Sequence, residues 1–211
     1  MQKPSFSISK PTLLTAEEAR ARDEQRAREA YRQRVKDSGV PRAFWNAKVS
    51  NDAVIRWARK VRAEHHGGNL VLEGFQGTGK TTQACAVLMG LTMDTPNGAH
   101  LMTRFATFGD VLREIRATYG GHGNERDVLS AYTGVRVLCI DDIGTEKPTE
   151  DALQQLFALV DKRYRDNKPT VFTTNYTQQG LGERLMSQGG DADTALKITR
   201  RIYQGAEVVR L

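Results

Sequence analysis

The sequence predicts an α/β fold, in which helices pack on both faces of a parallel β-sheet, preceded by a helical N-terminal extension. Three observations predict it. After Gly67 and Gly68, short apolar segments alternate with helical patterns. The segment "VRVLCID" at 135–141 is apolar on both faces, which is typical of a strand in a parallel sheet. A glycine-rich segment at 74–81 follows one predicted strand and opens a predicted helix.

The first part of the chain predicts a helix that stands apart from this sheet. Residues 1–14 contain two prolines and scattered serines, so we expect little regular structure there. Thr15 and Glu18 match a capping box, and helix-forming residues continue to about Lys36. The apolar stripe of this helix consists mostly of alanines, which bury little surface. We therefore divide the chain into a basic helical arm, 1–37, that docks a partner, and a domain spanning 38–211.

The remaining elements follow from apolar periodicity and helix caps. A helix at 51–65 is expected to turn Val54, Ile55, Trp57, Ala58 and Val61 inward. Strands are predicted at 69–74, 100–104, 135–141 and 170–175, and helices at 81–93 and 107–119. A further helix begins after the capping residue Thr149 and has an apolar face made of Leu153, Leu156, Phe157, Val160 and Tyr164.

Composition excludes several classes of protein. No apolar run approaches the ~20 residues that a membrane span needs, and the N-terminus lacks the apolar core of a secretory signal. The two cysteines, Cys85 and Cys139, lie in apolar contexts and are predicted to be buried thiols in a reducing compartment. We expect a cytoplasmic protein with no membrane contact.

The charge is distributed unevenly. Residues 1–65 contain 15 Lys or Arg against 8 Asp or Glu, whereas residues 66–211 contain 16 against 17. A basic segment beside a neutral domain fits a polyanion or an acidic partner surface. A solvated, charged helix explains the same numbers equally well.

The segment "GFQGTGKT" matches the phosphate-binding loop pattern G-x-x-x-x-G-K-[ST] in full and in the required context. Its glycines allow the backbone amides, together with the helix N-terminus, to surround an anion. Lys80 is expected to reach the β- and γ-phosphates, and the Thr81 hydroxyl to bind Mg²⁺. The residues assigned to nucleotide binding are Gly74, Gly77, Thr78, Gly79, Lys80, Thr81 and Thr82.

Two adjacent acids, Asp141 and Asp142, end the apolar strand that follows the loop lysine by about sixty residues. Asp141 is assigned to Mg²⁺ with Thr81, and Asp142 to activation of the attacking water. Aspartate is one methylene shorter than the more usual glutamate, so its reach is the open question. Asn175 ends the strand "TVFTTN" and either orients the water or simply begins a turn.

The order of these motifs resembles the AAA+ ATPases of the DnaC-like and IstB-like type, which load replicative helicases or assist transposases. The resemblance covers most of residues 38–209. Its specific part is "DDIGTEKPTEDALQQLFALVDKRYRDNKPTVFTTN", since the phosphate loop alone is generic. The resemblance implies an AAA+ P-loop NTPase core that uses ATP and Mg²⁺, with Asp142 as the water-activating acid and Asn175 as the first sensor.

The resemblance also implies an arginine finger, which acts on the ATP of a neighbouring subunit in a homo-oligomer. Arg201 in "ITRRIYQGAEVV" occupies the matching position, with Arg200 beside it and Arg184 as the next candidate. Two departures from the family pattern are noted. A polar insertion at 187–195 is predicted to be a surface loop, and the chain stops at "VVRL" without the Gly-x-x-x-Arg tail that carries a second sensor.

The implied function is ATP-dependent loading of a hexameric replicative helicase onto single-stranded DNA in a bacterial cell or phage-infected host. The arm would hold the helicase, and Arg113, Arg116 and Tyr119 in the helix near 105–119 resemble the part of the family that contacts DNA. An ordinary exposed helix explains these three residues equally well. The alternatives for the whole chain are a transposition helper ATPase and an ATP-gated binding module with little hydrolysis.

Overall fold

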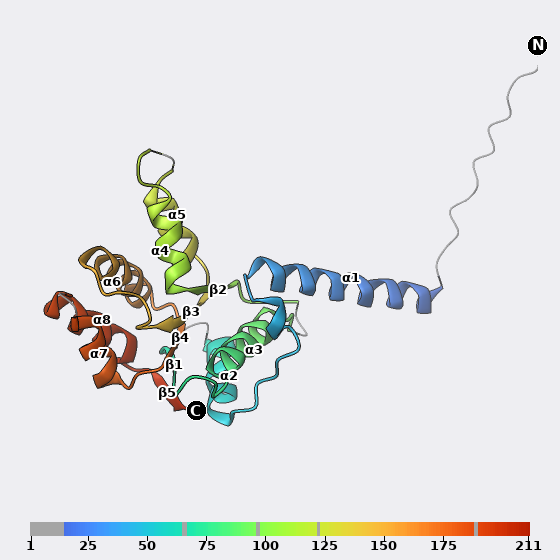
Figure 1. Ribbon diagram of the computed structural model, residues 1–211. Helices are drawn as coiled ribbons and strands as arrows, with labels where there is room; N and C mark the ends of the chain where they lie inside the picture. The colour runs from blue at the N-terminus through green and yellow to red at the C-terminus, as the bar shows by residue number, and fades with distance from the viewer. Residues whose placement is uncertain (1–14, 65–66, 96–97, 122, 188–189) are drawn as a thin grey trace, which may run out of the picture.

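A five-stranded, wholly parallel sheet forms the centre of the protein, with strand order β2-β3-β4-β1-β5 (Figure 1). The structure is a computed structural model that describes residues 15–64, 67–95, 98–121, 123–187 and 190–211. The strands are β1 (Leu70–Glu73), β2 (Thr103–Thr107), β3 (Val137–Ile143), β4 (Thr170–Thr174) and β5 (Glu207–Arg210). The α/β class with a parallel sheet is thereby confirmed.

Helices cover both faces of the sheet, as predicted (Figure 1). One face carries the end of α1 (Ala16–Asp37), the short 3-10 helix η1 (Arg42–Phe44), α2 (Asp52–Glu64) and α3 (Lys80–Thr92). The other face carries α4 (Phe108–Arg116), α5 (Glu125–Thr133), α6 (Glu150–Arg165), α7 (Gln178–Met186) and α8 (Ala192–Tyr203). None of the helices in the described parts of the chain is long and apolar enough to cross a membrane.

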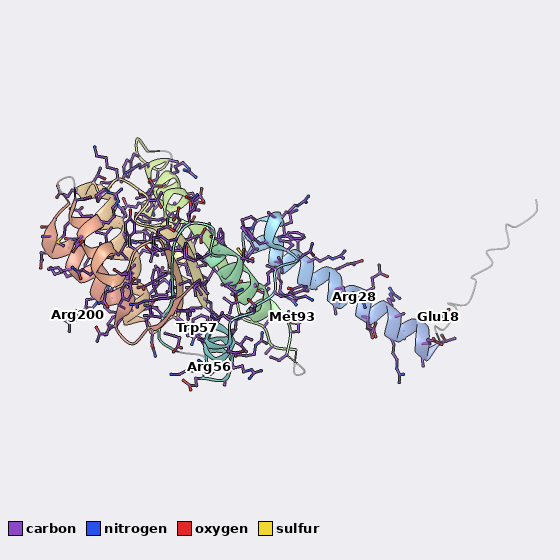
Figure 2. All side chains as sticks on the ribbon, turned by 60° about the horizontal axis from the view of Figure 1, so that its bottom comes forward. Glu18, Arg28, Arg56, Trp57, Met93 and Arg200 are labelled. Atoms are coloured by element: carbon purple, nitrogen blue, oxygen red, sulfur yellow. The ribbon has the colours of Figure 1, made fainter. Side chains whose placement is uncertain are left out.

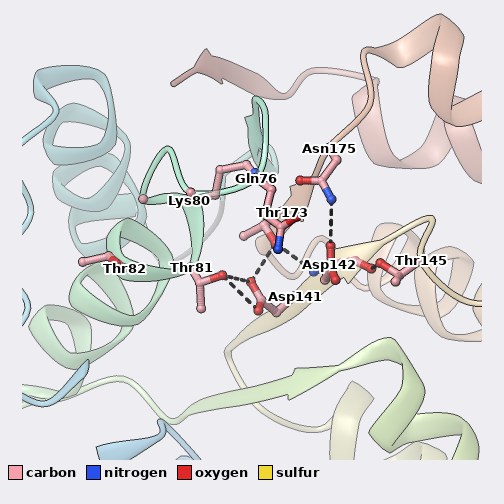
Figure 3. A pocket seen from close by; sticks show the side chains of 11 residues that line it. Gln76, Lys80, Thr81, Thr82, Asp141, Asp142, Thr145, Thr173 and Asn175 are labelled. Carbon is pink, nitrogen blue, oxygen red and sulfur yellow. Dashed lines mark hydrogen bonds between the residues drawn. The ribbon is translucent and has the colours of Figure 1, made fainter. Parts of the chain in front are cut away.

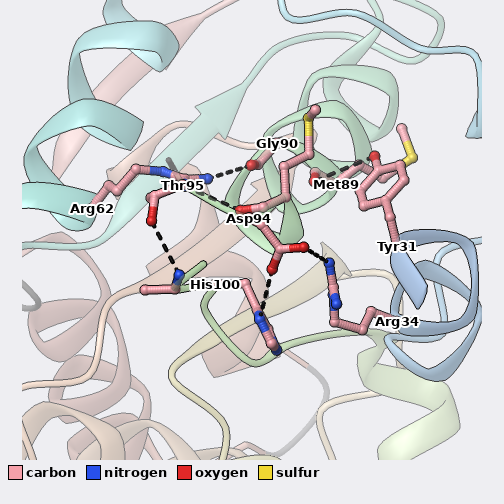
Figure 4. Close-up of polar contacts among 10 residues, drawn as sticks. Tyr31, Arg34, Arg62, Met89, Gly90, Asp94, Thr95 and His100 are labelled. Atoms are coloured by element: carbon pink, nitrogen blue, oxygen red, sulfur yellow. Dashed lines mark hydrogen bonds and ion pairs between the residues drawn. The ribbon is translucent and has the colours of Figure 1, made fainter. Parts of the chain in front are cut away.

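Helix α1 projects from the body of the molecule and is anchored only at its C-terminal end (Figures 1 and 2). The predicted capping box between Thr15 and Glu18 is present, and Val35 is the one buried residue of this helix. Near the anchor, the Arg34 guanidinium contacts Asp94 at 2.7 Å and the Tyr31 hydroxyl donates to the Met89 carbonyl at 3.5 Å (Figure 4). The last two turns of the arm therefore pack on the domain, and the division at 37/38 stays a prediction.

Several predicted elements differ from the structure in detail. The strand expected at 100–104 lies at Thr103–Thr107, because Thr107 caps α4 in a capping box with Asp110 and the strand runs up to that cap. The insertion at 187–195 is not a loop throughout, since Asp191 caps α8 and the helix begins at residue 192. Its residues 188–189, like the predicted irregular segment 1–14, lie outside the described residues.

The buried face of α6 was predicted almost correctly. Thr149 caps the helix, and Leu153, Leu156 and Val160 are buried. The prediction that Tyr164 is buried is wrong, since this residue is 37% exposed. The guanidinium of Arg201 stacks on its ring at 4.2 Å from the centroid, so the ring serves as a surface for a cation instead of a core contact.

Candidate nucleotide site

The phosphate loop and the two acids meet at the carboxyl ends of β1, β3 and β4. They line a cleft of about 480 Å³ together with Asn175, which follows β4. Parallel strands bring their carboxyl ends to one edge of the sheet, which is where open α/β sheets bind ligands. All the residues of this cleft are Gln76, Gly77, Gly79, Lys80, Thr81, Thr82, Asp141, Asp142, Thr145, Thr173 and Asn175 (Figure 3).

The loop has the backbone that an anion site requires. Gly77 and Gly79 have φ angles of 87° and 91°, in the left-handed region that a side chain strains. A Cβ added at either glycine would meet no atom within 4 Å, so these positions face open space. Gly79 precedes α3 and no side chain caps the amides of its first turn. These unpaired amides and the helix dipole fit the phosphates of a nucleotide.

The loop lysine is held by its own loop. Lys80 is 7% exposed, and its Nζ donates to the Gly74 carbonyl at 2.8 Å and the Phe75 carbonyl at 2.7 Å. The Lys80 ammonium group therefore lies at the cleft with hydrogen bonds to neutral carbonyls only. An anion that enters the cleft can replace these two carbonyls. Thr78 points back to the Phe75 carbonyl at 3.0 Å, which stabilises the loop instead of the cleft.

Asp141 is the buried acid of the pair, and it faces Thr81 as predicted. The Thr81 hydroxyl lies 3.0 and 3.1 Å from the two carboxylate oxygens, and Asp141 is 7% exposed. Burial raises the pKa of this carboxyl, the hydrogen bonds from Thr173 and Thr81 lower it in part, and the charge of Asp142 adds to the rise. A hydroxyl and a carboxylate at this separation are oxygen ligands suited to Mg²⁺, which takes its other ligands from water and phosphate.

Asp142 lies in an irregularity of the sheet. The pairing of β3 with β4 shifts between Ile140 and Ile143, and Asp142 has a φ of 60°. Such a bulge re-aims side chains beside a site. The Asn175 amide donates to the Asp142 carboxylate at 3.4 Å, so the two residues predicted to handle the water are neighbours (Figure 3).

Thr173 is a part of the site that the sequence analysis missed. Its hydroxyl donates to Asp141 Oδ1 at 2.7 Å and accepts the Asp142 amide at 2.8 Å, and the residue is 1% exposed. One buried hydroxyl thus orients the first acid and fixes the backbone of the second. The signal was a threonine two residues before Asn175, which alternation in a strand places on the same face as that residue.

The three arginine-finger candidates lie in different surroundings. The Arg201 guanidinium pairs with Asp161 at 3.1 Å. The backbone carbonyl of Arg201 accepts a hydrogen bond from the side-chain amide of Asn69, which precedes β1. This is the opposite edge of the sheet from the cleft, so Arg201 does not reach the cleft of its own chain. Arg200 is exposed, and Arg184 donates to the carbonyls of Gly144, Thr145 and Glu146 in the loop after β3.

The predicted DNA-contacting side chains of α4 have intramolecular partners. Arg113 pairs with Asp110, and Arg116 pairs with Asp151 at 3.1 Å. The Tyr119 hydroxyl donates to the same Asp151 carboxylate at 2.9 Å. Both cysteines are buried and free, and burial raises the pKa of the Cys85 thiol to about 12, so neither thiol offers a nucleophile.

Comparisons with known proteins agree with this geometry. The replicative helicase loader DnaC of Escherichia coli K12 is 26% identical over 156 residues, which cover 69% of this chain and 62% of DnaC. The solved structure of DnaI superposes with a TM-score of 0.67 at 24% identity, over 81% of this chain and 93% of that one. A structure of the DnaC helicase loader superposes with a TM-score of 0.60 at 22% identity, over 81% of this chain and 99% of that one. At these identities the two structures establish the fold alone, which this chain shares with DnaI and with the DnaC helicase loader.

The chain thus spans less than two thirds of the length of the curated loader that it matches. The family comparison covers much more of it. A model of the family described as IstB-like ATP binding protein matches residues 11–211, which include the arm from residue 11 onward and every residue of the cleft. On this match, and with a phosphate loop, paired acids and strand-tip asparagine in one cleft, the chain belongs to the IstB-like ATP-binding protein family.

Proposed function

We propose that this protein is an ATP-dependent DNA replication protein that loads a replicative helicase onto single-stranded DNA. The observation that carries the proposal is the convergence of Lys80, Thr81, Asp141, Asp142 and Asn175 on one cleft. The similarity to the helicase loader DnaC supports the choice of process over other uses of ATP. The work is done in the cytoplasm of a bacterial cell or phage-infected host.

ATP is bound with Mg²⁺, which when present supplies positive charge to the phosphate oxygens. Lys80 exchanges the Gly74 and Phe75 carbonyls for phosphate oxygens. Thr81 and Asp141 would hold the metal, since the Thr81 hydroxyl already lies within 3.1 Å of both Asp141 carboxylate oxygens. Asp142 accepts a proton from the attacking water, and the neighbouring Asn175 amide orients that water. The expected reaction is slow hydrolysis to ADP and phosphate.

A second copy of the chain completes the site. Among the residues described, no arginine lines the cleft, so the charge that develops in the transition state lacks a guanidinium from the same subunit. Arg201, on the opposite edge of the sheet, is the residue assigned to the neighbour's ATP.

The projecting arm is assigned to the helicase. It exposes nearly its whole length, and only its C-terminal turns are fixed to the domain. Such a helix gains most of its stability from a partner surface. The hexameric helicase and the single-stranded DNA are thus the two macromolecular partners of the proposed loader.

Turnover with single-stranded DNA tests the enzymatic part. Wild-type protein is expected to release phosphate in a Mg²⁺-dependent reaction that Asp142→Asn abolishes while binding of a fluorescent ATP analogue persists. A wild-type rate no higher than that of the variant would refute hydrolysis. It would favour the ATP-gated binding module, for which the short Asp142 side chain is the supporting observation.

Capture of a partner tests the loading part. Full-length protein is expected to retain a replicative helicase in an ATP-dependent complex, and deletion of residues 1–30 is expected to release it. Retention of a transposase in place of any helicase would assign the chain to the transposition helpers. Deletion stops at residue 30 because Tyr31, Arg34 and Val35 contact the domain.

A further inference from the structure

The positive charge of the first third of the chain is concentrated outside the arm. Residues 1–37 contain nine Lys or Arg and six Asp or Glu, so opposite charges are interleaved along the arm. Residues 38–64 contain six Lys or Arg and only two Asp or Glu. The shorter segment therefore carries a surplus of four against three for the arm, so the larger net positive charge belongs to α2 and the residues that lead into it.

Helix α2 separates this charge from the core. Its buried residues are Val54, Trp57 and Val61, at the spacing of one helical face. Arg56, Arg59 and Lys60 are exposed, and their positions along the helix place them together on its outer face. We call these three residues the α2 cation cluster. Figure 2 labels Arg56 on this helix.

The side chains of the α2 cation cluster form no ion pair or hydrogen bond within the described part of the chain. Asp52 lies four residues before Arg56 and Glu64 lies four residues after Lys60, so these two acids face the ends of the cluster without bonding to it. Like charges three and four residues apart destabilise a helix. Asp52 and Glu64 offset part of this repulsion, and an external anion would give the three cations the close partner that they lack in the described part of the chain. On α4, by contrast, Arg113 and Arg116 already have carboxylate partners.

A shallow apolar groove of about 230 Å³ lies beside the cluster, between α2 and α3. Val49, Ile55 and Ala58 line it, and Arg59 and Arg62 stand at it. The Arg62 guanidinium is fixed by the Met93 carbonyl at 3.2 Å and by the Gly90 carbonyl, so its charge borders the groove in a defined position (Figure 4). The groove is too small for the three or four anchors of an amphipathic helix, but it accepts one flat apolar group.

We propose that the α2 cation cluster binds the phosphate backbone of single-stranded DNA, with one base resting against the neighbouring groove. A row of unpaired cations beside a small apolar surface is the combination by which proteins hold a single strand without reading its sequence. The inference rests on the proposed function in that it names DNA as the partner. It assigns that partner to the α1–α3 side of the sheet, away from the α4 side chains that the sequence indicated.

The test uses full-length protein and a fluorescent oligothymidylate in an anisotropy titration. The α2 variant carries Arg56→Gln, Arg59→Gln and Lys60→Gln. The matched control carries Arg26→Gln, Arg28→Gln and Arg32→Gln on the arm, which removes the same charge from another exposed helix. Loss of three phosphate contacts is expected to weaken binding about 100-fold near 0.1 M salt, and to reduce the slope of log K against log salt by about 2. The control should keep most of both quantities.

Each outcome has a defined meaning. Equal losses in the two variants, or full binding by the α2 variant, would overturn the inference and leave the DNA partner standing. Absence of binding by wild-type protein would refute the DNA partner itself, and with it both proposals.

Competition by polyglutamate as effective as by unlabelled oligothymidylate would reassign the cluster to an acidic protein. A duplex competitor separates single from double strands. Unchanged urea midpoints and ATP-analogue binding show that the variants are folded.

Discussion

Replacement of Thr173 by valine is the sharpest test of how the site is built. Valine keeps the shape and the strand preference of threonine but removes the hydroxyl. The change deletes the hydrogen bond to Asp141 Oδ1 at 2.7 Å and leaves the Asp142 amide without its acceptor at 2.8 Å. Both effects act on the two acids, and on no part of the phosphate loop.

The expected size follows from these two contacts. A hydrogen bond to a charged group contributes about 1.5–3 kcal/mol, and an unsatisfied buried amide costs about 1–3 kcal/mol. Because the two losses share one hydroxyl and are not additive, we expect the free energy of unfolding to fall by about 2–4 kcal/mol. The pKa of Asp141 should also rise, since the hydrogen bond from Thr173 lowers it in the wild type.

The neighbouring Thr174 offers a matched control. Its hydroxyl donates to the Ile143 carbonyl at 2.9 Å and accepts the Tyr176 amide at 3.3 Å, and it is as buried as Thr173. Thr174→Val should therefore cost comparable stability without touching either acid. Thr173→Ser, which keeps the hydroxyl, should stay close to wild type in both measurements below.

Two measurements separate a structural effect from an effect on the site. Urea unfolding gives the loss of stability, and Mg²⁺-dependent binding of a fluorescent ATP analogue is followed against pH. In Thr173→Val the acid limb of the binding profile should move to higher pH, because Asp141 must be ionised to hold the metal. It should not move in Thr174→Val. An unmoved limb in Thr173→Val, with stability lost as in the control, would refute the role given to this hydroxyl.

Three further outcomes are expected. Asp141→Asn should raise the thermal midpoint of the nucleotide-free protein at neutral pH, and this gain should disappear in acid, as calorimetry against pH can check. The reason is that the raised pKa of Asp141 makes the wild-type protein less stable as pH rises from the ordinary pKa of an aspartate to the raised value. Arg163→Met should lower the free energy of unfolding by about 1–3 kcal/mol or more, read from urea midpoints, since four backbone carbonyls lose a buried donor. Asp94→Asn should speed amide exchange in the last turns of α1 without moving the domain midpoint.

The class of the fold and the parts of the cleft were predictable because they depend on local signals. Capping at Thr15 and Thr149 set two helix starts correctly. The phosphate loop and the acids of β3 follow strands of one parallel sheet, so their meeting at its carboxyl edge follows from topology. The two cysteines were correctly expected to be buried, since each lies within an apolar run.

The parts that were missed lack such signals. Helix α5 buries only Tyr132, and β5 is a four-residue edge strand with one buried side chain, so neither shows a clear period. The stacking of Arg201 on Tyr164 joins two residues that are distant in sequence, and it forms only when α6 and α8 pack. The role of Thr173 depends on the bulge in β3, which brings both acids to its hydroxyl. Each of these facts belongs to tertiary structure.

The side chains of Lys80, Thr81 and Asp141 have hydrogen-bond partners in the ligand-free cleft, which constrains how ligands bind. Lys80 is engaged by two loop carbonyls, and Thr81 is engaged by Asp141. A nucleotide must therefore replace the two carbonyls on Lys80, and a metal must replace the hydrogen bond between Thr81 and Asp141. The binding free energy of each ligand is reduced by the contacts that it replaces, so either ligand alone binds weakly through these side chains. Because the phosphates bind both Lys80 and the metal, the two exchanges favour one another. Binding of ATP and of Mg²⁺ to this cleft should thus be strongly cooperative, and Thr81→Val should remove that cooperativity while leaving metal-free nucleotide binding intact.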